Sequence, residues 1–254
     1  VVLRTDAPVA TIELARPERL NALTLAMLGQ IDAICAELAA RTDVRVVVVR
    51  SSSARAFCAG ADVNEWSVLG PEGMWQRWIA EGHRVFDRLA RLPMPTIASI
   101  SGVAFGGGLE LALACDLRLA SPDARFALPE TRIGVVPGWG GTARLAALIG
   151  AGRAKQMALT GEPVDAEEAC RWGMINQVVD AAALPSRVQA VAMRIADGPR
   201  IAVQVTKQLI DGSLPRGPTA AIEALAAGFV AGTDDLREGV AAFREKRPPR
   251  FRRD

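Results

Sequence analysis

The sequence predicts an α/β fold that is followed by a helical layer. In the first half of the chain, short alternating or β-branched segments are separated by segments with helical periodicity. From about residue 142 onward the pattern is mostly helical. Strands that alternate with helices favour a mixed α/β core, and a helical remainder favours an appended layer. A length of 254 residues fits one large domain or one domain with an appendage.

The predicted strands are short. Residues 9–14 alternate between apolar and polar side chains, as a half-buried strand does. Residues 44–49 form a β-branched run, which indicates a buried strand. Further strands are expected at residues 96–101, 117–120 and 176–179.

Helices are predicted between these strands and after them. Residues 23–40 place Leu28, Ile31, Ile34, Cys35 and Leu38 on one apolar stripe. The sequence Asp165-Ala166-Glu167-Glu168 has the composition of a capping box, and Gly173 is a typical helix stop. The other helices are expected at residues 72–92, 109–114, 186–197, 201–211, 218–231 and 233–246.

The composition excludes several function classes. The net charge is +2 and the charged fraction 23%, so nothing attracts the whole chain to nucleic acid or to a membrane. There is no Tyr, and Gly-x-Ser-x-Gly, HExxH and Walker motifs are absent. A triad would depend on His83 alone, which we interpret as an exposed or supporting residue. The remaining candidates for acid–base chemistry are carboxylates.

The cysteines indicate a reducing compartment. Cys35, Cys58, Cys115 and Cys170 form no CxxC pair, so we expect buried free thiols and neither a metal site nor a disulfide framework. Residues 1–6 carry no signal-peptide pattern, and no apolar run approaches the length of a spanning helix. We therefore expect a cytoplasmic protein.

The most informative segment is Gly106-Gly107-Gly108-Leu109-Glu110, which precedes a helical run. Consecutive glycines let the backbone approach a ligand closely, and amides at a helix start favour negative charge. A second carboxylate follows in Leu128-Pro129-Glu130. A donor site with two acids suits a reaction that passes through an oxyanion.

Three other segments have more than one interpretation. Residues 138–143 contain a G-x-G-x-x-A string, a weak nucleotide signal because no clear βαβ opening strand precedes it. The small residues of segment 56–63 fit a ligand-facing loop or an ordinary connection. The basic residues 244–254 fit a solvated tail or a phosphate contact equally well; an RNA contact is disfavoured by the lack of interleaved aromatics.

Together these segments resemble the crotonase family, also called the enoyl-CoA hydratase/isomerase family. The resemblance spans nearly the whole chain in family order. It is carried by residues 19–23, 57–62, 102–110, 114–116, 126–130, 134–142, 161–173 and 243–251. It implies a crotonase-like ββα superhelix at residues 1–195 and a C-terminal α-helical trimerisation region at residues 196–254. The expected assembly is a homotrimer or a dimer of trimers.

The resemblance implies acyl-CoA chemistry without a separate cofactor, because coenzyme A enters as part of the thioester substrate. The backbone N–H groups of Ala61 and Gly107 would form an oxyanion hole. Glu110 would deprotonate the attacking water, and Glu130 would deliver a proton to Cα. Many members of the family lack one of these glutamates, so the presence of both favours hydratase over isomerase, decarboxylase or hydrolase.

The resemblance also implies the substrate-binding residues. Arg19, Leu20 and Ala22 would lie along the nucleotide, the backbone near Ala59 and Asp62 would meet the adenine, and Lys246 with Phe243 would approach the phosphates. The full expected set is Arg19, Leu20, Ala22, Ala59, Gly60, Asp62, Val63, Gly106, Pro129, Trp139, Phe243 and Lys246.

The tryptophans distinguish this chain within the resemblance. Trp66, Trp75 and Trp78 lie in the family's variable segment, and Trp139 occupies a position that is often small in the family. They indicate either ordinary packing or a pocket for a short or aromatic acyl group. The sequence thus favours an enoyl-CoA hydratase. The alternatives are an isomerase or another crotonase-type enzyme with one glutamate, and more distantly a non-catalytic RNA-binding scaffold.

Overall fold

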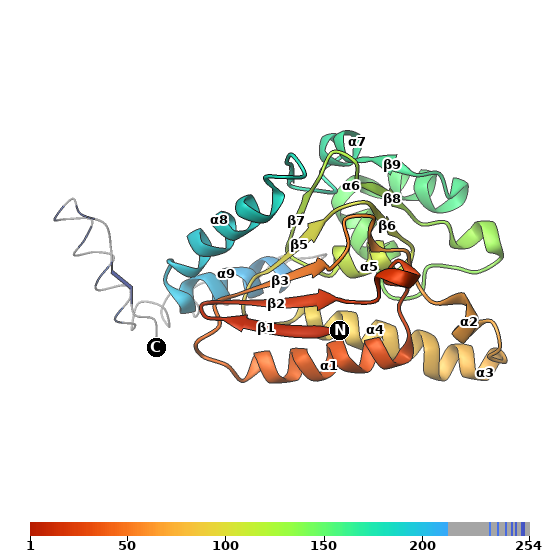
Figure 1. Ribbon diagram of the computed structural model, residues 1–254, viewed down its shortest axis with the longest axis horizontal. Helices are drawn as coiled ribbons and strands as arrows, with labels where there is room; N and C mark the ends of the chain where they lie inside the picture. The colour runs from red at the N-terminus through yellow and green to blue at the C-terminus, as the bar shows by residue number, and fades with distance from the viewer. Residues whose placement is uncertain are drawn as a thin grey trace.

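Two β-sheets form the core of the computed structural model (Figure 1). The structure describes residues 1–212 and the further positions 234, 238, 242, 245, 247, 250 and 251. The six-stranded sheet has the order β1 (Val2–Asp6), β2 (Val9–Leu14), β3 (Val46–Ser51), β5 (Thr96–Ile100), β7 (Leu117–Ala120) and β10 (Gln177–Val178). The four-stranded sheet has the order β4 (Ala56–Cys58), β6 (Val103–Phe105), β8 (Arg125–Ala127) and β9 (Val164–Asp165).

The chain alternates between the two sheets. The pairs β3/β4, β5/β6 and β7/β8 each place one strand in each sheet, and all the pairings among these strands are parallel. Each pair is followed by helical structure, which is α2 (Val63–Trp66) to α4 (Ala80–Ala90), then α5 (Gly107–Leu113), then α6 (Gly141–Thr160). This repeated ββα unit confirms the predicted superhelix in the described residues.

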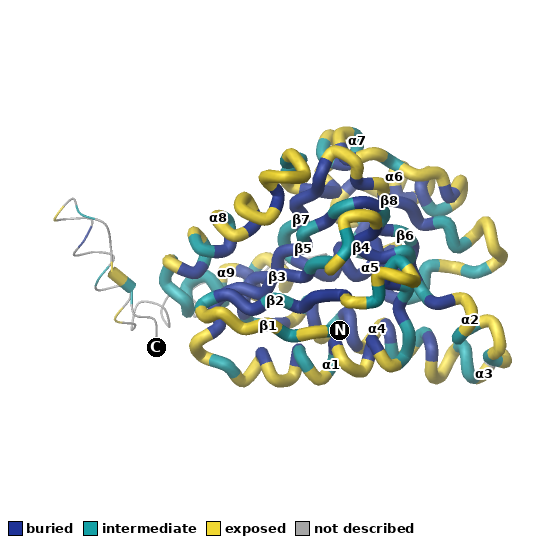
Figure 2. The backbone as a smooth tube through the Cα atoms, in the orientation of Figure 1, coloured by how far each residue is buried: buried dark blue, intermediate teal, exposed yellow. Residues whose placement is uncertain are grey.

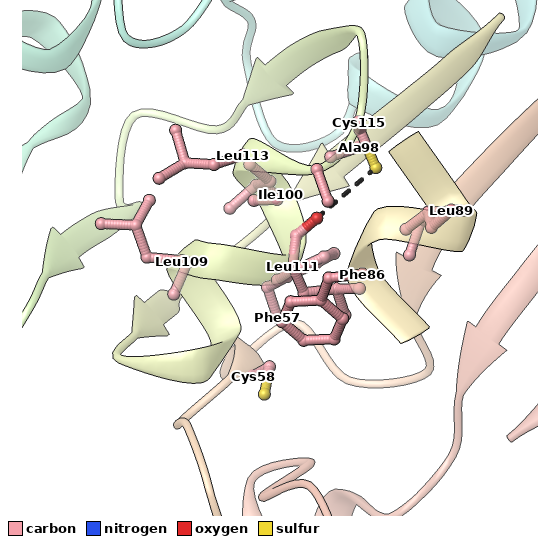
Figure 3. Packing of buried hydrophobic residues seen from close by; sticks show 14 of the residues in the cluster. Phe57, Cys58, Phe86, Leu89, Ala98, Ile100, Leu109, Leu111, Leu113 and Cys115 are labelled. Carbon is pink, nitrogen blue, oxygen red and sulfur yellow. Dashed lines mark hydrogen bonds between the residues drawn. The ribbon is translucent and has the colours of Figure 1, made fainter. Parts of the chain in front are cut away.

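Strand β3 separates two hydrophobic clusters. Val47 and Val49 belong to a large cluster with residues of α1 (Leu25–Ala39) and α4. Val46 and Val48 belong to a second cluster with Leu184, from α8 (Leu184–Ala196), which lies against the sheet. Figure 2 shows the buried backbone concentrated in these inner strands and in α5, and Figure 3 shows the large cluster around Phe57 and Phe86. The prediction of a buried strand is confirmed, and the strand is buried on both faces.

Several predicted elements differ in detail from the observed ones. The helix expected at residues 72–92 consists of α3 (Pro71–Gly73), a π-helical turn (Met74–Ile79) and α4. Helix α6 is kinked at Gly150. The sequence does not predict β1, β4, β6, β8 or β9: β4, β6 and β8 have three residues each and β9 has two, too few to show a period, and β1 is largely exposed.

The predicted cap of α7 (Ala166–Arg171) is present, because the Asp165 side chain accepts a hydrogen bond from Glu168 N at 2.8 Å. Helix α9 (Arg200–Gly212) matches the helix expected at 201–211. The predictions for residues 218–231 and 233–246 fall on segments that lie outside the described residues except at four positions, 234, 238, 242 and 245.

Other expectations concern the cysteines, metals and membranes. Cys35, Cys58 and Cys115 are buried free thiols, and Cys170 is half-buried. No helix in the described residues is long and apolar enough to cross a membrane. The same residues contain no cluster of His, Cys, Asp and Glu that could hold a metal ion. The His83 side chain is 51% exposed and lies 3.5 Å from Asp87, as an exposed supporting histidine should.

The space around two glycines, one in α5 and one in α1, predicts that their substitution by Ala changes stability in opposite directions. A Cβ at Gly108 would overlap the Cys58 carbonyl of β4, whereas Gly29 in α1 has open space around it. We expect Gly108→Ala to lower the free energy of unfolding by about 1–3 kcal/mol through overpacking. Gly29→Ala should raise it by about 0.5–1 kcal/mol through helix propensity. Urea denaturation measures both, and equal stability of the two variants would contradict this packing.

Candidate active site

The start of α5 is pressed against two neighbouring segments. Gly106 has φ 49° and ψ −126°, a conformation that favours glycine. Its N–H donates to Ala127 O of β8 at 2.9 Å. A Cβ at Gly106 would lie 2.7 Å from Glu130 Oε1, and one at Gly108 would overlap Cys58 O. Three glycines therefore bring the helix start into contact with the end of β4 and with η3 (Glu130–Ile133).

The backbone amides of Ala61 and Gly107 lie side by side. A Cβ built on Gly107 would be 3.5 Å from Ala61 N, and one on Gly60 would be 3.7 Å from Gly107 N. Neither N–H group has a partner among the backbone hydrogen bonds of the described residues. Gly107 is also the first residue of α5, where the helix itself leaves N–H groups unpaired. Two adjacent donors are thus available to one acceptor.

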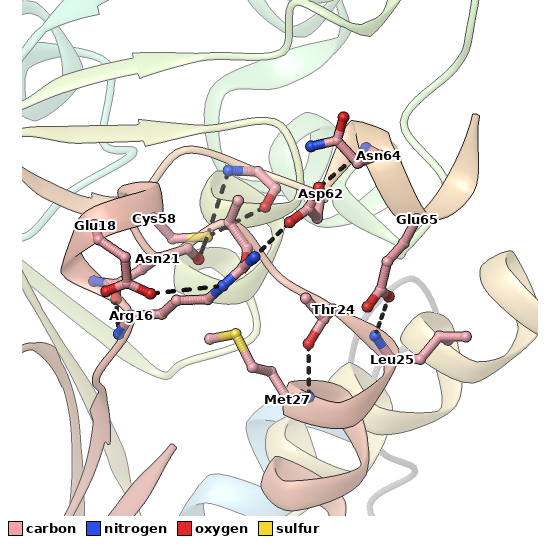
Figure 4. A network of polar contacts seen from close by, with 12 residues as sticks. Arg16, Glu18, Asn21, Thr24, Leu25, Met27, Cys58, Asp62, Asn64 and Glu65 are labelled. Atoms are coloured by element: carbon pink, nitrogen blue, oxygen red, sulfur yellow. Dashed lines mark hydrogen bonds and ion pairs between the residues drawn. The ribbon is translucent and has the colours of Figure 1, made fainter. Parts of the chain in front are cut away.

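A polar network holds the loop that carries Ala61 (Figure 4). The Asn21 side chain donates to Phe57 O at 3.1 Å, and Arg16 Nη1 donates to Asp62 Oδ2 at 2.6 Å. Leu23 N donates to Gly60 O at 2.7 Å, and Asp62 N donates to Leu23 O at 2.8 Å. The hydrogen bond from Arg16 holds the pKa of Asp62 below its usual range.

Neither Arg16 nor Asn21 was singled out from the sequence. The only local signal was an Asn at a turn, and Asn21 does adopt a positive φ of 56°. Both residues act by tying together segments that are distant in sequence, so a reading of local pattern does not find them.

Glu110 lies in the first turn of α5 and is 2% exposed. Its Oε1 accepts hydrogen bonds from Trp139 N and Gly141 N, both at 2.8 Å. Burial raises the pKa of Glu110, while these two amides and the charge of Arg144 oppose the rise. The backbone N–H groups of the G-x-G-x-x-A string are therefore directed at this carboxylate.

Glu130 has a different environment from Glu110. It is half-buried at the start of η3, and its Oε2 is buried without a hydrogen-bond partner among the described residues. Burial, with a smaller contribution from Glu110, raises the pKa of Glu130 to about 7. One carboxylate is held by hydrogen bonds and the other is poised to carry a proton at neutral pH, a division typical of acid–base pairs.

Trp139 fills the space next to Gly107. It is 2% exposed, and Cβ atoms built on Gly82 or Gly107 would run into its ring. Its Nε1 donates to Trp78 O at 3.2 Å, and its ring lies 5.6 Å from that of Trp78. Phe86 meets the same ring edge-on at 5.3 Å. Of the other tryptophans, Trp66 is half-buried and Trp75 is 71% exposed.

Most of the remaining predicted substrate-binding residues lie in the described part of the chain, and two do not. Ala59 N donates to Leu20 O at 2.9 Å, which joins the segment of Arg19, Leu20 and Ala22 to the loop of Ala61. Val63 is 49% exposed at the start of α2, and Pro129 is half-buried beside Glu130. Phe243 and Lys246 lie outside the described residues.

Known proteins similar to this chain share its full length. The family model described as enoyl-CoA hydratase/isomerase matches residues 4–254. A short-chain-enoyl-CoA hydratase of Clostridium acetobutylicum is 36% identical over 97% of this chain and 95% of that protein. An (E)-benzylidenesuccinyl-CoA hydratase of Thauera aromatica is 36% identical over 99% and 98%. A crystal structure of an enoyl-CoA hydratase from Bacillus anthracis has a TM-score of 0.95 at 35% identity, with 100% and 99% coverage.

The environment of Glu130 predicts a pH-dependent cost to stability. Its pKa rises from 4.5 to about 7 on folding, so the folded state binds more protons than the unfolded state between these values. Stability contributed by the neutral carboxyl is then present below about pH 4.5 and is lost as the pH rises through about 7. Glu130→Gln should therefore be more stable than the wild type at pH 8, by about 1–3 kcal/mol after allowance for partial exposure.

Thermal unfolding at pH 5 and pH 8 measures this difference. The advantage of the variant should shrink at the lower pH. If the variant is less stable than the wild type at pH 8, other groups stabilise the buried Glu130 carboxylate. That result would contradict the prediction.

Proposed function

This chain belongs to the enoyl-CoA hydratase/isomerase family, and we propose that Glu110 and Glu130 are the acid–base pair with which it hydrates the 2,3 double bond of an enoyl-CoA thioester. The observation that carries the proposal is the placement of both carboxylates beside two adjacent backbone N–H groups that have no backbone partner among the described residues. Hydratase activity is supported by full-length relatives with that name, and the isomerase and RNA-binding alternatives are not favoured.

The proposed reaction adds the parts of one water molecule to two carbons. The thioester carbonyl accepts hydrogen bonds from Ala61 N and Gly107 N, which stabilise the negative charge that develops on its oxygen. Water attacks Cβ and gives its proton to Glu110, while the electrons of the double bond move toward the carbonyl. Glu130 then protonates Cα. Loss of one such oxyanion donor costs about 10²–10³ in rate in enzymes of this type.

The environments of the carboxylates support these separate roles. Both hydrogen bonds to Glu110 end on Oε1, which leaves Oε2 as the oxygen that would hold the water. Glu130, with a pKa of about 7, would retain a proton to donate at neutral pH. No separate cofactor or metal enters this mechanism, because the coenzyme A moiety belongs to the substrate.

We place the coenzyme A moiety along Arg19, Leu20 and Ala22 and against the backbone at 59–63, since these two segments are hydrogen-bonded to each other. Gly106 and Pro129 would border the reacting carbons. Phe243 and Lys246 are retained as proposed phosphate contacts. The proposed assembly is a homotrimer or a dimer of trimers in the cytoplasm, with no nucleic-acid or membrane partner.

The proposed acyl group is short or aromatic. The Trp139 ring occupies the volume next to Gly107, where a longer chain leaving the reacting carbons would need room. The two named relatives act, by their names, on a short-chain enoyl-CoA and on an aryl-bearing acyl-CoA. A short acyl group and an aryl-bearing one would each fit the proposed pocket, which the Trp139 ring closes.

Substitution of either glutamate tests the mechanism. We expect Glu110→Gln and Glu130→Gln each to lower kcat for crotonyl-CoA hydration by about 10²–10⁴, because each removes a proton-transfer group. Loss of the enoyl absorbance measures the reaction. Full activity in either variant would remove the two-glutamate mechanism, and turnover of a 3-enoyl-CoA alone would identify an isomerase.

A chain-length series tests the role of Trp139. We expect Trp139→Phe to raise kcat/KM for an eight-carbon enoyl-CoA relative to crotonyl-CoA, because a smaller ring opens space beside Gly107. Trp139→Ala extends the test but removes a large buried ring at a cost of about 3–5 kcal/mol, so its fold is checked by circular dichroism. Trp75→Ala, at an exposed tryptophan, is the control. Identical profiles for wild type and Trp139→Phe would count against a pocket wall.

A further inference from the structure

We propose that Arg144 is a positioning residue that fixes the loop at residues 138–141 against α4 and thereby keeps the Glu110 carboxylate aimed. The inference rests on the proposed function for its kinetic consequences. It concerns groups that do not touch the substrate in the mechanism above.

The loop at residues 138–141 is the support of the Glu110 carboxylate. Two of its backbone N–H groups, those of Trp139 and Gly141, donate to Glu110 Oε1. The direction of the carboxylate therefore depends on where this loop lies. A shift of 1 Å in a catalytic group can cost about 10²-fold in rate.

Arg144 ties this loop to α4. Its Nη1 donates to Trp139 O at 2.9 Å, and its Nη2 donates to Asp87 Oδ1 at 2.5 Å. A Cβ at Gly140, which has a positive φ of 91°, would run into Nη1, so the guanidinium lies directly over the loop. The same residue, Trp139, thus gives its N–H to Glu110 and its C=O to Arg144.

A second contact ties the loop to the same helical segment. The Trp139 ring packs on Gly82 of α4 and donates to Trp78 O of the π-helical turn. The Trp139 ring and the Arg144 guanidinium therefore each hold the loop against this helical segment. The Arg144 side chain is 19% exposed, so its bonds are largely shielded from solvent.

The charge of Arg144 adds an electrostatic effect. Around Glu110, the charged groups on neighbouring elements are Glu130 of η3 and Arg144 of α6. Arg144 opposes the burial-driven rise in the pKa of Glu110, and Glu110 in turn raises the pKa of Glu130. Behind Arg144, Asp87 is also approached by His83 at 3.5 Å and by Arg91 at 3.9 Å.

Three substitutions separate the geometric effect from the charge. Arg144→Gln removes both the guanidinium geometry and its charge. Arg144→Lys keeps the charge but cannot reach Trp139 O and Asp87 together as a planar guanidinium does. Asp87→Asn removes the charged partner of Arg144 on α4. Arg91→Gln is the matched control, because Arg91 also approaches Asp87 but its side chain is 82% exposed. Thermal unfolding first establishes that each variant is folded.

We expect kcat for crotonyl-CoA to fall about 10- to 100-fold in Arg144→Gln and to fall less in Arg144→Lys and Asp87→Asn. The acidic limb of kcat/KM against pH should move to higher pH in Arg144→Gln only, since the base must be ionised to act. The control should retain the wild-type profile. Wild-type kcat and an unmoved limb in folded Arg144→Gln would overturn the inference.

A second measurement does not depend on turnover. In protein with ¹³C at the glutamate side-chain carboxyls, the Glu110 resonance is assigned by its loss in Glu110→Gln. Its titration should shift to higher pH in Arg144→Gln and remain near wild type in Arg91→Gln. An unchanged titration would contradict the inference. Failure of the wild type to hydrate any enoyl-CoA would instead contradict the proposed function and leave this titration as the test of Arg144.

Discussion

The close approach of three side-chain-free residues, Gly106 to Gly108, to the end of β4 and the start of η3 is the contact on which the site depends. Gly108 lies against Cys58, Gly107 against the Ala61 loop and Trp139, and Gly106 against Glu130. Any side chain at these positions would separate elements that the chemistry needs together. The superhelix makes the contact possible, because successive turns place β4, β6 and β8 side by side in one sheet.

The two glutamates show how one fold creates two environments for the same group. Glu110 is the more deeply buried, yet it receives two amides from the loop at 138–141 and the field of Arg144. In the described part of the chain no group hydrogen-bonds to Glu130 Oε2, and burial raises the pKa of Glu130 to about 7, while it also raises that of Glu110. Unsatisfied buried groups are costly and tend to occur where function requires them. The difference between the two carboxylates is the strongest structural argument for separate base and acid roles.

Local pattern was sufficient for the longer elements and insufficient for the site. The strands at residues 9–14 and 117–120 coincide with β2 and β7, although β2 is buried along nearly its whole length and its burial does not alternate as its sequence does. The strands β4 and β8 escape such a reading, since three residues cannot show a period. The superhelix itself came from a resemblance and could not be derived from spacing.

The supporting residues of the site are tertiary in origin. Arg16, Asn21 and Arg144 act across 46, 36 and 57 positions of sequence separation, so no local signal identifies them. The G-x-G-x-x-A string illustrates the same limit. It is a weak nucleotide signal in the sequence, and in the folded chain the N–H groups at 139 and 141 face a carboxylate of the protein itself.

The central claim is that Ala61 N and Gly107 N polarise a thioester carbonyl, and backbone groups cannot be removed by side-chain substitution. The direct measurement is the ¹³C resonance of crotonyl-CoA labelled at the thioester carbonyl and bound to Glu110→Gln, in which turnover should be slow. Two hydrogen bonds to the carbonyl oxygen withdraw electrons from the carbon, so the resonance should move downfield from its position in free crotonyl-CoA. A bound ligand whose carbonyl resonance stays at the free position would contradict the account.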